Sequence, residues 1–312
     1  MATLRVPLHV PSAVEDAKNL WMACEEREAD EKTLIDILAH RDEAQRLQII
    51  QSYEDHYNGN LIDRLEYELS GEFKEALYCW MFNHVQRGAI IANMAMWKWL
   101  DYRAIVETAC INSTKELLEV KQAYHDLFKR SLEEDVAKMT NGDLRKLLVG
   151  LVSTYRYDGK EIVKSLALYE ANILHDVIRK KLFNHDEVIR IFTTRSKAQL
   201  IATFNKYKDE FGISILKDLS SGSPDLFPSV LKIIIRSIIS PHKYFQKLLR
   251  LALNGEVTDE NVLARIIVTR AEKDLQEIKD MYEERGKMSL IAAINNKTSG
   301  HFKNFILELI GN

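Results

Sequence analysis

Proline and glycine are scarce in this chain, and that scarcity constrains its fold more than any other feature. The 312 residues include only 5 prolines and 12 glycines, and no proline stands between Pro11 and Pro224. Sheet proteins need turns rich in these residues about every 8–12 positions, because consecutive strands must reverse direction. The sequence therefore predicts an all-α protein.

Composition excludes several classes of protein. The 43 basic and 46 acidic residues leave a formal charge of −3, which argues against a strongly basic nucleic-acid binder. No apolar run approaches the 18 residues of a membrane span, and the first residues lack the apolar core of a signal peptide. Three scattered cysteines show no metal-ligand spacing, which favours reduced thiols. We expect a cytoplasmic protein that is not transmembrane and binds no nucleic acid.

A fourfold internal repeat runs through the chain. A tyrosine recurs in each unit and an aliphatic residue follows it eight positions later, at Tyr53 and Leu61, Tyr124 and Leu132, Tyr207 and Ile215, and Tyr282 and Leu290. Three apolar columns precede them: Leu34, Ile105, Val188 and Leu263; Ile37, Thr108, Ile191 and Ile266; Leu38, Ala109, Phe192 and Ile267. Spacings of three and four place these columns on one helical face. Units of about 70–85 residues exceed common solenoid repeats, so we predict bundles of about five helices, about twenty in all.

Helix-capping signals follow the same register. A capping box pairs an N-terminal acceptor with a Glu or Gln three residues later. The four predicted boxes are Asp42 with Gln45, Ser113 with Glu116, Ser196 with Gln199 and, shifted by two positions, Thr269 with Glu272. We expect the four repeats to span residues 14–84, 85–158, 159–242 and 243–312.

The repeat signature resembles that of the annexin family. The similarity covers residues 14–312 and is strongest in four segments, residues 33–41, 131–136, 194–199 and 268–272. The Tyr155-Arg156-Tyr157 triplet and the opening residues up to Ser12 are similar to the plant branch. The resemblance implies a curved disk of four domains whose convex loops bind calcium and acidic phospholipid.

The calcium loops of this family are altered here. The resemblance implies a Gly-x-Gly-Thr loop and an acidic residue forty positions after its second glycine. The loops read Glu26-Arg27-Glu28-Ala29, Trp97-Lys98-Trp99-Leu100, Lys180-Lys181-Leu182-Phe183 and Gly255-Glu256-Val257-Thr258, and the distant positions hold Glu68, Met139, Gly222 and Lys297. Calcium requires a shell of oxygen ligands, and a lysine repels it. We expect weak or atypical calcium binding in repeat one at most, through Glu68, Glu28 and Glu26. The alternative is that Glu68 pairs locally.

The altered loops suggest membrane contact that does not need calcium. The candidate contact residues are Trp97, Lys98 and Trp99 in repeat two, Lys180 and Lys181 in repeat three, and Gly255, Val257 and Thr258 in repeat four. Exposed aromatic rings enter the headgroup layer, and lysine meets anionic lipid. Core packing of the tryptophans is the alternative that the sequence leaves open.

Three further features resemble properties proposed for plant annexins. His40 would support haem binding or a peroxidase-like activity, and Ile189-Arg190-Ile191 resembles an actin-binding triplet. Cys110 fits one partner of a proposed thiol pair, but Ile239 stands at the second position. We predict a non-enzymatic protein that binds acidic phospholipid membranes peripherally. The alternatives are a soluble helical scaffold for a protein such as actin and a His40-based enzyme.

Overall fold

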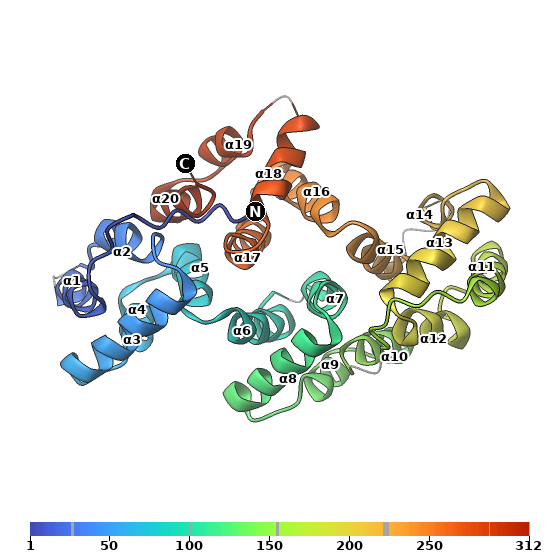
Figure 1. Ribbon diagram of the computed structural model, residues 1–312, viewed down its shortest axis with the longest axis horizontal. Helices are drawn as coiled ribbons and strands as arrows, with labels where there is room; N and C mark the ends of the chain where they lie inside the picture. Colours follow the sequence, from blue (N-terminus) through green and yellow to red (C-terminus); the bar gives the residue numbers. More distant parts are fainter. Residues whose placement is uncertain (26–27, 100, 154–155, 221–224, 287, 312) are drawn as a thin grey trace. The chain divides into compact units, whose positions relative to one another are not determined.

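The computed structural model describes residues 1–25, 28–99, 101–153, 156–220, 225–286 and 288–311, and its regular elements there are all α-helices. Twenty helices are present within these ranges, five in each predicted repeat (Figure 1). The prediction of an all-α, fourfold-repeated chain is confirmed.

The helices of repeats one and two are α1 (Ala13–Glu25), α2 (Glu31–Leu38), α3 (Glu43–Tyr57), α4 (Leu61–Glu68), α5 (Gly71–Met81), α6 (His84–Trp97), α7 (Tyr102–Ile111), α8 (Thr114–Phe128), α9 (Leu132–Met139) and α10 (Gly142–Val152). Those of repeats three and four are α11 (Lys164–Arg179), α12 (Asp186–Thr194), α13 (Lys197–Phe211), α14 (Ile215–Asp218), α15 (Leu226–Ile239), α16 (Pro241–Asn254), α17 (Glu260–Arg270), α18 (Leu275–Glu284), α19 (Leu290–Lys297) and α20 (Gly300–Leu309).

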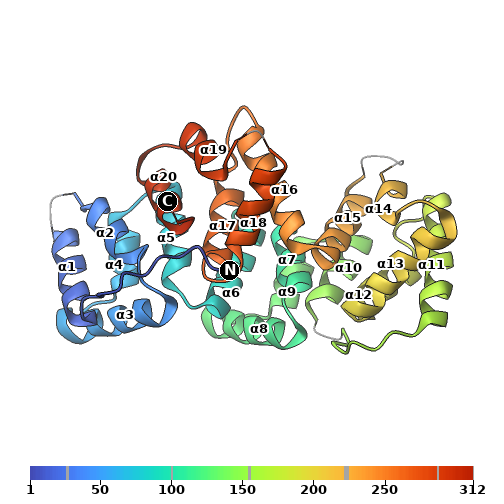
Figure 2. The same cartoon turned by 45° about the horizontal axis from the view of Figure 1, so that its top comes forward.

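The chain divides into two compact units. The first combines Met1–Arg87 with His242–Asn312, so repeats one and four form it together, and the second is Gly88–Pro241. In the first unit α5 packs against α17 and α20, the blue and red helices that lie side by side in Figure 1. In the second, α7 packs against α15, and α10 packs against α12. Within repeat one, α3 runs across the end of α1 (Figure 2).

The repeat columns form the cores of the two units. The tyrosines, the aliphatic residues that follow them and the three upstream columns are all buried in the four repeats. Fully burying one Leu or Ile side chain contributes roughly 1.5–3 kcal/mol, so these columns are a major source of stability. The helical periodicity therefore identified the core correctly.

The predicted capping boxes have three different outcomes. Both hydrogen bonds of the box are present at Asp42 and at Ser113. Ser196 caps α13, but the side chain of Gln199 bonds the backbone of Val163 instead. The fourth box was wrong. Thr269 lies inside α17, where its hydroxyl donates to the carbonyl of Arg265 at 2.7 Å, and α18 begins after Asp274.

Glu272 does not form the predicted capping box. Its side chain instead takes part in a buried charged cluster of the first unit. Arg46 donates two hydrogen bonds to its carboxylate, at 3.2 and 3.0 Å, and Arg87 lies 3.3 Å from the same group. Both guanidiniums stack on the ring of Trp80, with centroid distances of 3.8 and 4.7 Å. The cluster joins Arg46 and Trp80 of repeat one and Arg87 at the start of repeat two to Glu272 of repeat four, which is far away in the sequence.

Candidate functional site: the loops between the first and second helices

The candidate loops connect the first and second helices of each repeat. In repeats one and four they share a framework, because Asp30 N–H donates to the Ala23 carbonyl at 2.9 Å and Asp259 N–H donates to the Ala252 carbonyl at 3.1 Å. Asp30 also caps α2, and Asp259 caps α17. The carboxylates thus cap the start of the second helix, and the backbone N–H groups of the same two residues bond the end of the first.

In repeat one, Glu68 is held by an arginine of its own helix. Arg64 lies 3.1 Å from the Glu68 carboxylate and 3.6 Å from that of Glu25. The same guanidinium donates to the Cys24 carbonyl at 2.5 Å, at the end of α1. Local pairing, the alternative stated for Glu68, describes this geometry. Glu28 is exposed, while Glu26 lies outside the described residues.

Arg64 occupies a repeat position that holds aspartate in repeats two and three and Ala293 in repeat four. Eleven residues after the repeat tyrosine, Asp135 accepts a hydrogen bond from Tyr124 at 2.6 Å, and Asp218 accepts one from Tyr207. Burial and this bond raise the pKa of the Tyr124 hydroxyl. Arg64 turns toward the loop instead. The sequence prediction missed it, although the exchange of Asp for Arg in one column was a visible signal.

In repeat four, Lys297 reaches into the loop. Its ammonium donates to the Gly255 carbonyl at 3.1 Å, and the Thr258 hydroxyl donates to the Lys297 carbonyl at 2.9 Å. The positively charged side chain of Lys297 thus contacts a backbone oxygen of the loop. Val257, next to it, is 85% exposed, so one of the predicted membrane-contact residues is open to solvent.

In repeat two, Trp97 is exposed and flanked by two cations. Its side chain is 41% exposed, and the Arg130 guanidinium and Lys138 ammonium lie 5.3 and 5.2 Å from the ring centroid. Lys98 is exposed and Trp99 half-buried. The core-packing alternative therefore does not describe Trp97. The sequence prediction missed Arg130 and Lys138, which come from the segment just before α9 and from α9 itself.

In repeat three, Lys180 and Lys181 are exposed, as their predicted role requires. Lys181 adopts φ 57°, a left-handed conformation that costs an L-residue roughly 1–2 kcal/mol. Leu182 is 48% exposed, whereas Phe183 is buried. The loop thus presents two ammonium groups and one apolar side chain to solvent.

In repeats one and four, described oxygens that could bind calcium contact a cationic side chain of the protein. Among the described residues, no group of three or more His, Cys, Asp or Glu side chains could hold a metal ion. In repeats one and four the oxygens nearest the family's site contact Arg64 and Lys297, which are charged like the ion itself. A calcium shell needs 6–8 oxygen ligands, and these cations would compete for them.

The remaining candidate residues have structural partners. The His40 ring contacts the Asp36 carbonyl at 3.1 Å through Nδ1 and the Glu308 carboxylate at 3.3 Å through Nε2. Ile189 and Ile191 are buried, and Arg190 pairs with Glu187 at 2.8 Å. The three cysteines are buried and form no disulfide bond, and burial raises the pKa of the Cys24 thiol to about 11.

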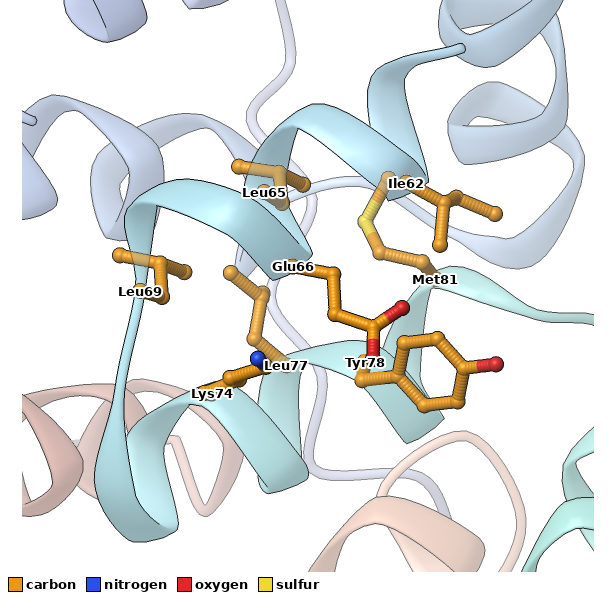
Figure 3. A pocket seen from close by; sticks show the side chains of 8 residues that line it. All are labelled: Ile62, Leu65, Glu66, Leu69, Lys74, Leu77, Tyr78 and Met81. Carbon is orange, nitrogen blue, oxygen red and sulfur yellow. The ribbon is translucent and has the colours of Figure 1, made fainter.

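A small pocket lies between α4 and α5 (Figure 3). Its lining is mainly aliphatic, from Ile62, Leu65, Leu69, Leu77 and Met81, together with Glu66, Lys74 and Tyr78. Its space of about 200 Å³, which includes open solvent, is below the 300–1,000 Å³ of typical ligand pockets. Burial is the main cause that raises the Tyr78 pKa.

The part of the chain that the structure describes has no helix long and apolar enough to cross a membrane.

Comparisons with known proteins give one consistent result. The annexin family model matches residues 15–80, 91–151, 169–223 and 244–309, each within one predicted repeat. The annexin-like protein RJ4 of Fragaria ananassa is 48% identical over 100% of this chain and 99% of its own length, and annexin D7 of Arabidopsis thaliana is 45% identical with the same coverage.

Solved structures agree with the sequence matches. Chicken annexin V superposes with a TM-score of 0.90 at 26% identity, over 100% of this chain and 99% of that one. Calcium-bound annexin (Sm)1 gives a TM-score of 0.80 at 27% identity, over 100% and 93% of the two chains.

Proposed function

Because the chain belongs to the annexin family and is of the plant type, we propose that it binds acidic phospholipid membranes peripherally, with its calcium dependence weakened or lost. Annexins in general bind phospholipid and calcium. The finer proposal is that side chains of this protein replace most of what calcium does at the membrane, on the cytoplasmic side.

The observation that carries the proposal is the exposed Trp97 ring between Arg130 and Lys138. An indole ring prefers the headgroup layer, where its apolar face is sheltered and its N–H still finds a partner. The two cations beside it meet lipid phosphates and carboxylates at the same depth. Each basic side chain near an anionic surface contributes about 1 kcal/mol.

The loops of repeats three and four supply further contacts in this proposal. Lys180 and Lys181 add two exposed charges beside the exposed Leu182. Val257 adds an apolar side chain in the loop of repeat four. The exposed Glu25 and Glu28 of repeat one oppose binding to anionic lipid, so repeats two to four carry it.

Two other functions have weaker support. An actin contact through residues 189–191 would rest on Arg190 alone, since both isoleucines are buried. A reaction at His40 would compete with the contacts of its two ring nitrogens to Asp36 and Glu308. We therefore assign no reaction, and a protein partner such as actin remains the alternative function.

Co-sedimentation with phosphatidylserine vesicles in calcium chelator at low salt tests the proposal. The wild-type protein is expected to pellet, and Trp97→Ala is expected to weaken binding about tenfold through lost burial of the ring, roughly 1.4 kcal/mol or more. Tyr169→Ala, which removes a 62% exposed aromatic ring from α11, is the matched control and should bind normally. Absence of wild-type pelleting would refute the proposal.

A further inference from the structure

Among the described residues, the loops of repeats one and four each place a side-chain cation against a backbone carbonyl. In repeat four the ammonium of Lys297 lies 3.1 Å from the Gly255 carbonyl oxygen. In repeat one the guanidinium of Arg64 bonds the Cys24 carbonyl and lies 3.1 Å from the Glu68 carboxylate. In both loops, the positive charge beside these oxygens therefore belongs to a side chain of the protein.

The two cations reach equivalent loops from different places in the repeat. Arg64 lies in the middle of α4, and Lys297 is the last residue of α19. The backbone bonds of Asp30 and Asp259 close the two loops in the same way. The two loops have the same backbone hydrogen bond, but the cation comes from a different position of the repeat in each. What the two repeats share is therefore the loop itself, whose oxygens contact a positively charged side chain in both.

From this geometry we propose that Lys297 and Arg64 are resident cations that take the place of a metal ion in the loops of repeats four and one. Each loop is then a latent calcium site that a single substitution uncovers. The proposal concerns the loops alone, and it holds whether or not the protein binds membranes.

In repeat four, the length of the side chain at position 297 allows a glutamate to replace the lysine and hold a calcium ion beside the loop. Lysine places its charge five atoms from Cα, and glutamate places its oxygens four atoms away. A calcium ion 2.3–2.6 Å from a glutamate oxygen would then take the place of the ammonium beside the Gly255 carbonyl. Thr258, whose hydroxyl bonds the Lys297 backbone carbonyl, does not depend on the side chain at position 297 and continues to fix this contact.

In repeat one, calcium binding requires only that the positive charge of Arg64 be removed, and no new ligand has to be introduced. Glu68 and Glu25 already lie 3.1 and 3.6 Å from the Arg64 guanidinium, and the Cys24 carbonyl accepts from it. Arg64→Gln would keep much of the side-chain volume and leave these oxygens without their cation. The two carboxylates then repel one another unless another cation enters.

Calorimetric titration of the full chain with calcium chloride, without lipid, tests the proposal. We expect Lys297→Glu and Arg64→Gln each to bind calcium at least tenfold more tightly than the wild type, with a Kd of about 10⁻⁴–10⁻³ M at the weak end of protein calcium sites. Lys243→Glu is the matched control. It makes the same charge change as Lys297→Glu on α16, about 18 Å along the helix from the Gly255 loop, and should leave calcium affinity unchanged.

Circular dichroism and thermal unfolding establish that each variant is folded. Because the two variants lie in different loops, each tests the proposal independently of the other. The proposal is overturned if both folded variants bind calcium no better than Lys243→Glu, or if the wild type already binds with their affinity. Because lipid is absent, a failed vesicle experiment would leave these results unaffected.

Discussion

Glu272 shows how one side chain can stabilise two buried cations. Arg46 and Arg87 are almost completely buried, and both pair with its carboxylate while stacking on Trp80. Burial lowers the pKa of Arg87 to about 10, against the opposing charge of Glu272. Burial alone would raise the pKa of Glu272, but the hydrogen bonds and charges of Arg46 and Arg87 outweigh it and lower that pKa.

Glu272→Gln is expected to lower the free energy of unfolding by about 3 kcal/mol at pH 7, because two buried guanidiniums lose their counter-charge. The folded-state pKa of Glu272 is depressed, so its contribution is present above the unfolded value of about 4.3 and is lost as pH falls through the folded value. Urea denaturation between pH 7 and pH 3 measures both effects. The wild type should lose more stability than the variant below pH 5.

The control for this experiment is Glu119→Gln, whose carboxylate is exposed and lies 3.9 Å from Lys115. A change of at most about 0.5 kcal/mol is expected there. Equal effects at positions 119 and 272 would contradict the role of the buried cluster.

Trp97 is the residue whose surroundings should change most at a membrane. Its ring is partly in water in the free protein, whereas Trp21 stacks on Tyr57 with ring centroids 5.1 Å apart. We expect Trp97→Phe to remove the larger part of the blue shift in tryptophan emission on vesicle binding. Trp21→Phe should leave the shift nearly intact, and the reverse pattern would refute the assignment.

At the scale of helices, the capping box predicted at Asp42 was correct and the one predicted at Thr269 was wrong, and substitutions at the two positions should differ in their effect on stability. Asp42→Ala removes the side-chain acceptor of the Gln45 N–H in the capping box at the start of α3, while the backbone N–H of residue 42 is kept, and should cost about 1 kcal/mol. Thr269→Val removes only a hydroxyl inside α17 and should cost less than about 0.5 kcal/mol. Thermal unfolding of both variants measures the difference. Equal destabilisation would mean that Thr269 acts as a cap after all.

The helical columns were predictable because burial imposes a period on the sequence. Leu34, Tyr53 and Leu61 are buried as their spacing indicates, as are their counterparts in the other repeats. The fourth capping box was misread because Thr269 and Glu272 have the right spacing, while the helix ends at Arg270 and Glu272 bonds distant arginines. Spacing describes neighbours along the chain and carries no information about such partners.

The candidate loops were only partly predictable for the same reason. The sequence shows which glycines are replaced, and Lys180 and Lys181 of repeat three are exposed, while their contact with a membrane stays a prediction. It does not show that Arg130 and Lys138 approach Trp97, or that Arg64 reaches Cys24, because these contacts join different elements. Lys297 was predicted to repel calcium, and the structure adds the Gly255 carbonyl that it bonds.

At the scale of the molecule, the first unit is built from both ends of the chain. Thr3 N–H donates to the Ala271 carbonyl at 2.9 Å, and its hydroxyl donates to the Leu309 carbonyl at 2.6 Å. With the Glu272 cluster, these contacts tie the first residues and repeat one to repeat four. Residues remote in sequence therefore contribute to the stability of the first unit.

The net charge of −3 is too small and of the wrong sign to draw the whole protein to an anionic membrane. Attraction in this account is local, from loop cations. Raising the ionic strength from ~0.01 to ~0.15 M shortens the Debye length from about 30 to about 8 Å and should weaken vesicle binding severalfold. A double variant, Lys180→Glu with Lys181→Glu, should bind more weakly and respond less to salt. Lys115→Glu on α8, at an 85% exposed side chain, is the control.

The most direct test of the central claim is the affinity of the wild-type protein for phosphatidylserine vesicles across a titration of free calcium at constant ionic strength. If Lys297 and Arg64 already supply the cations of their loops, the vesicle Kd in chelator and in millimolar calcium should agree within about twofold, or 0.4 kcal/mol. A Kd that tightens more than tenfold with calcium would contradict the account, because the loops would then depend on an added metal ion.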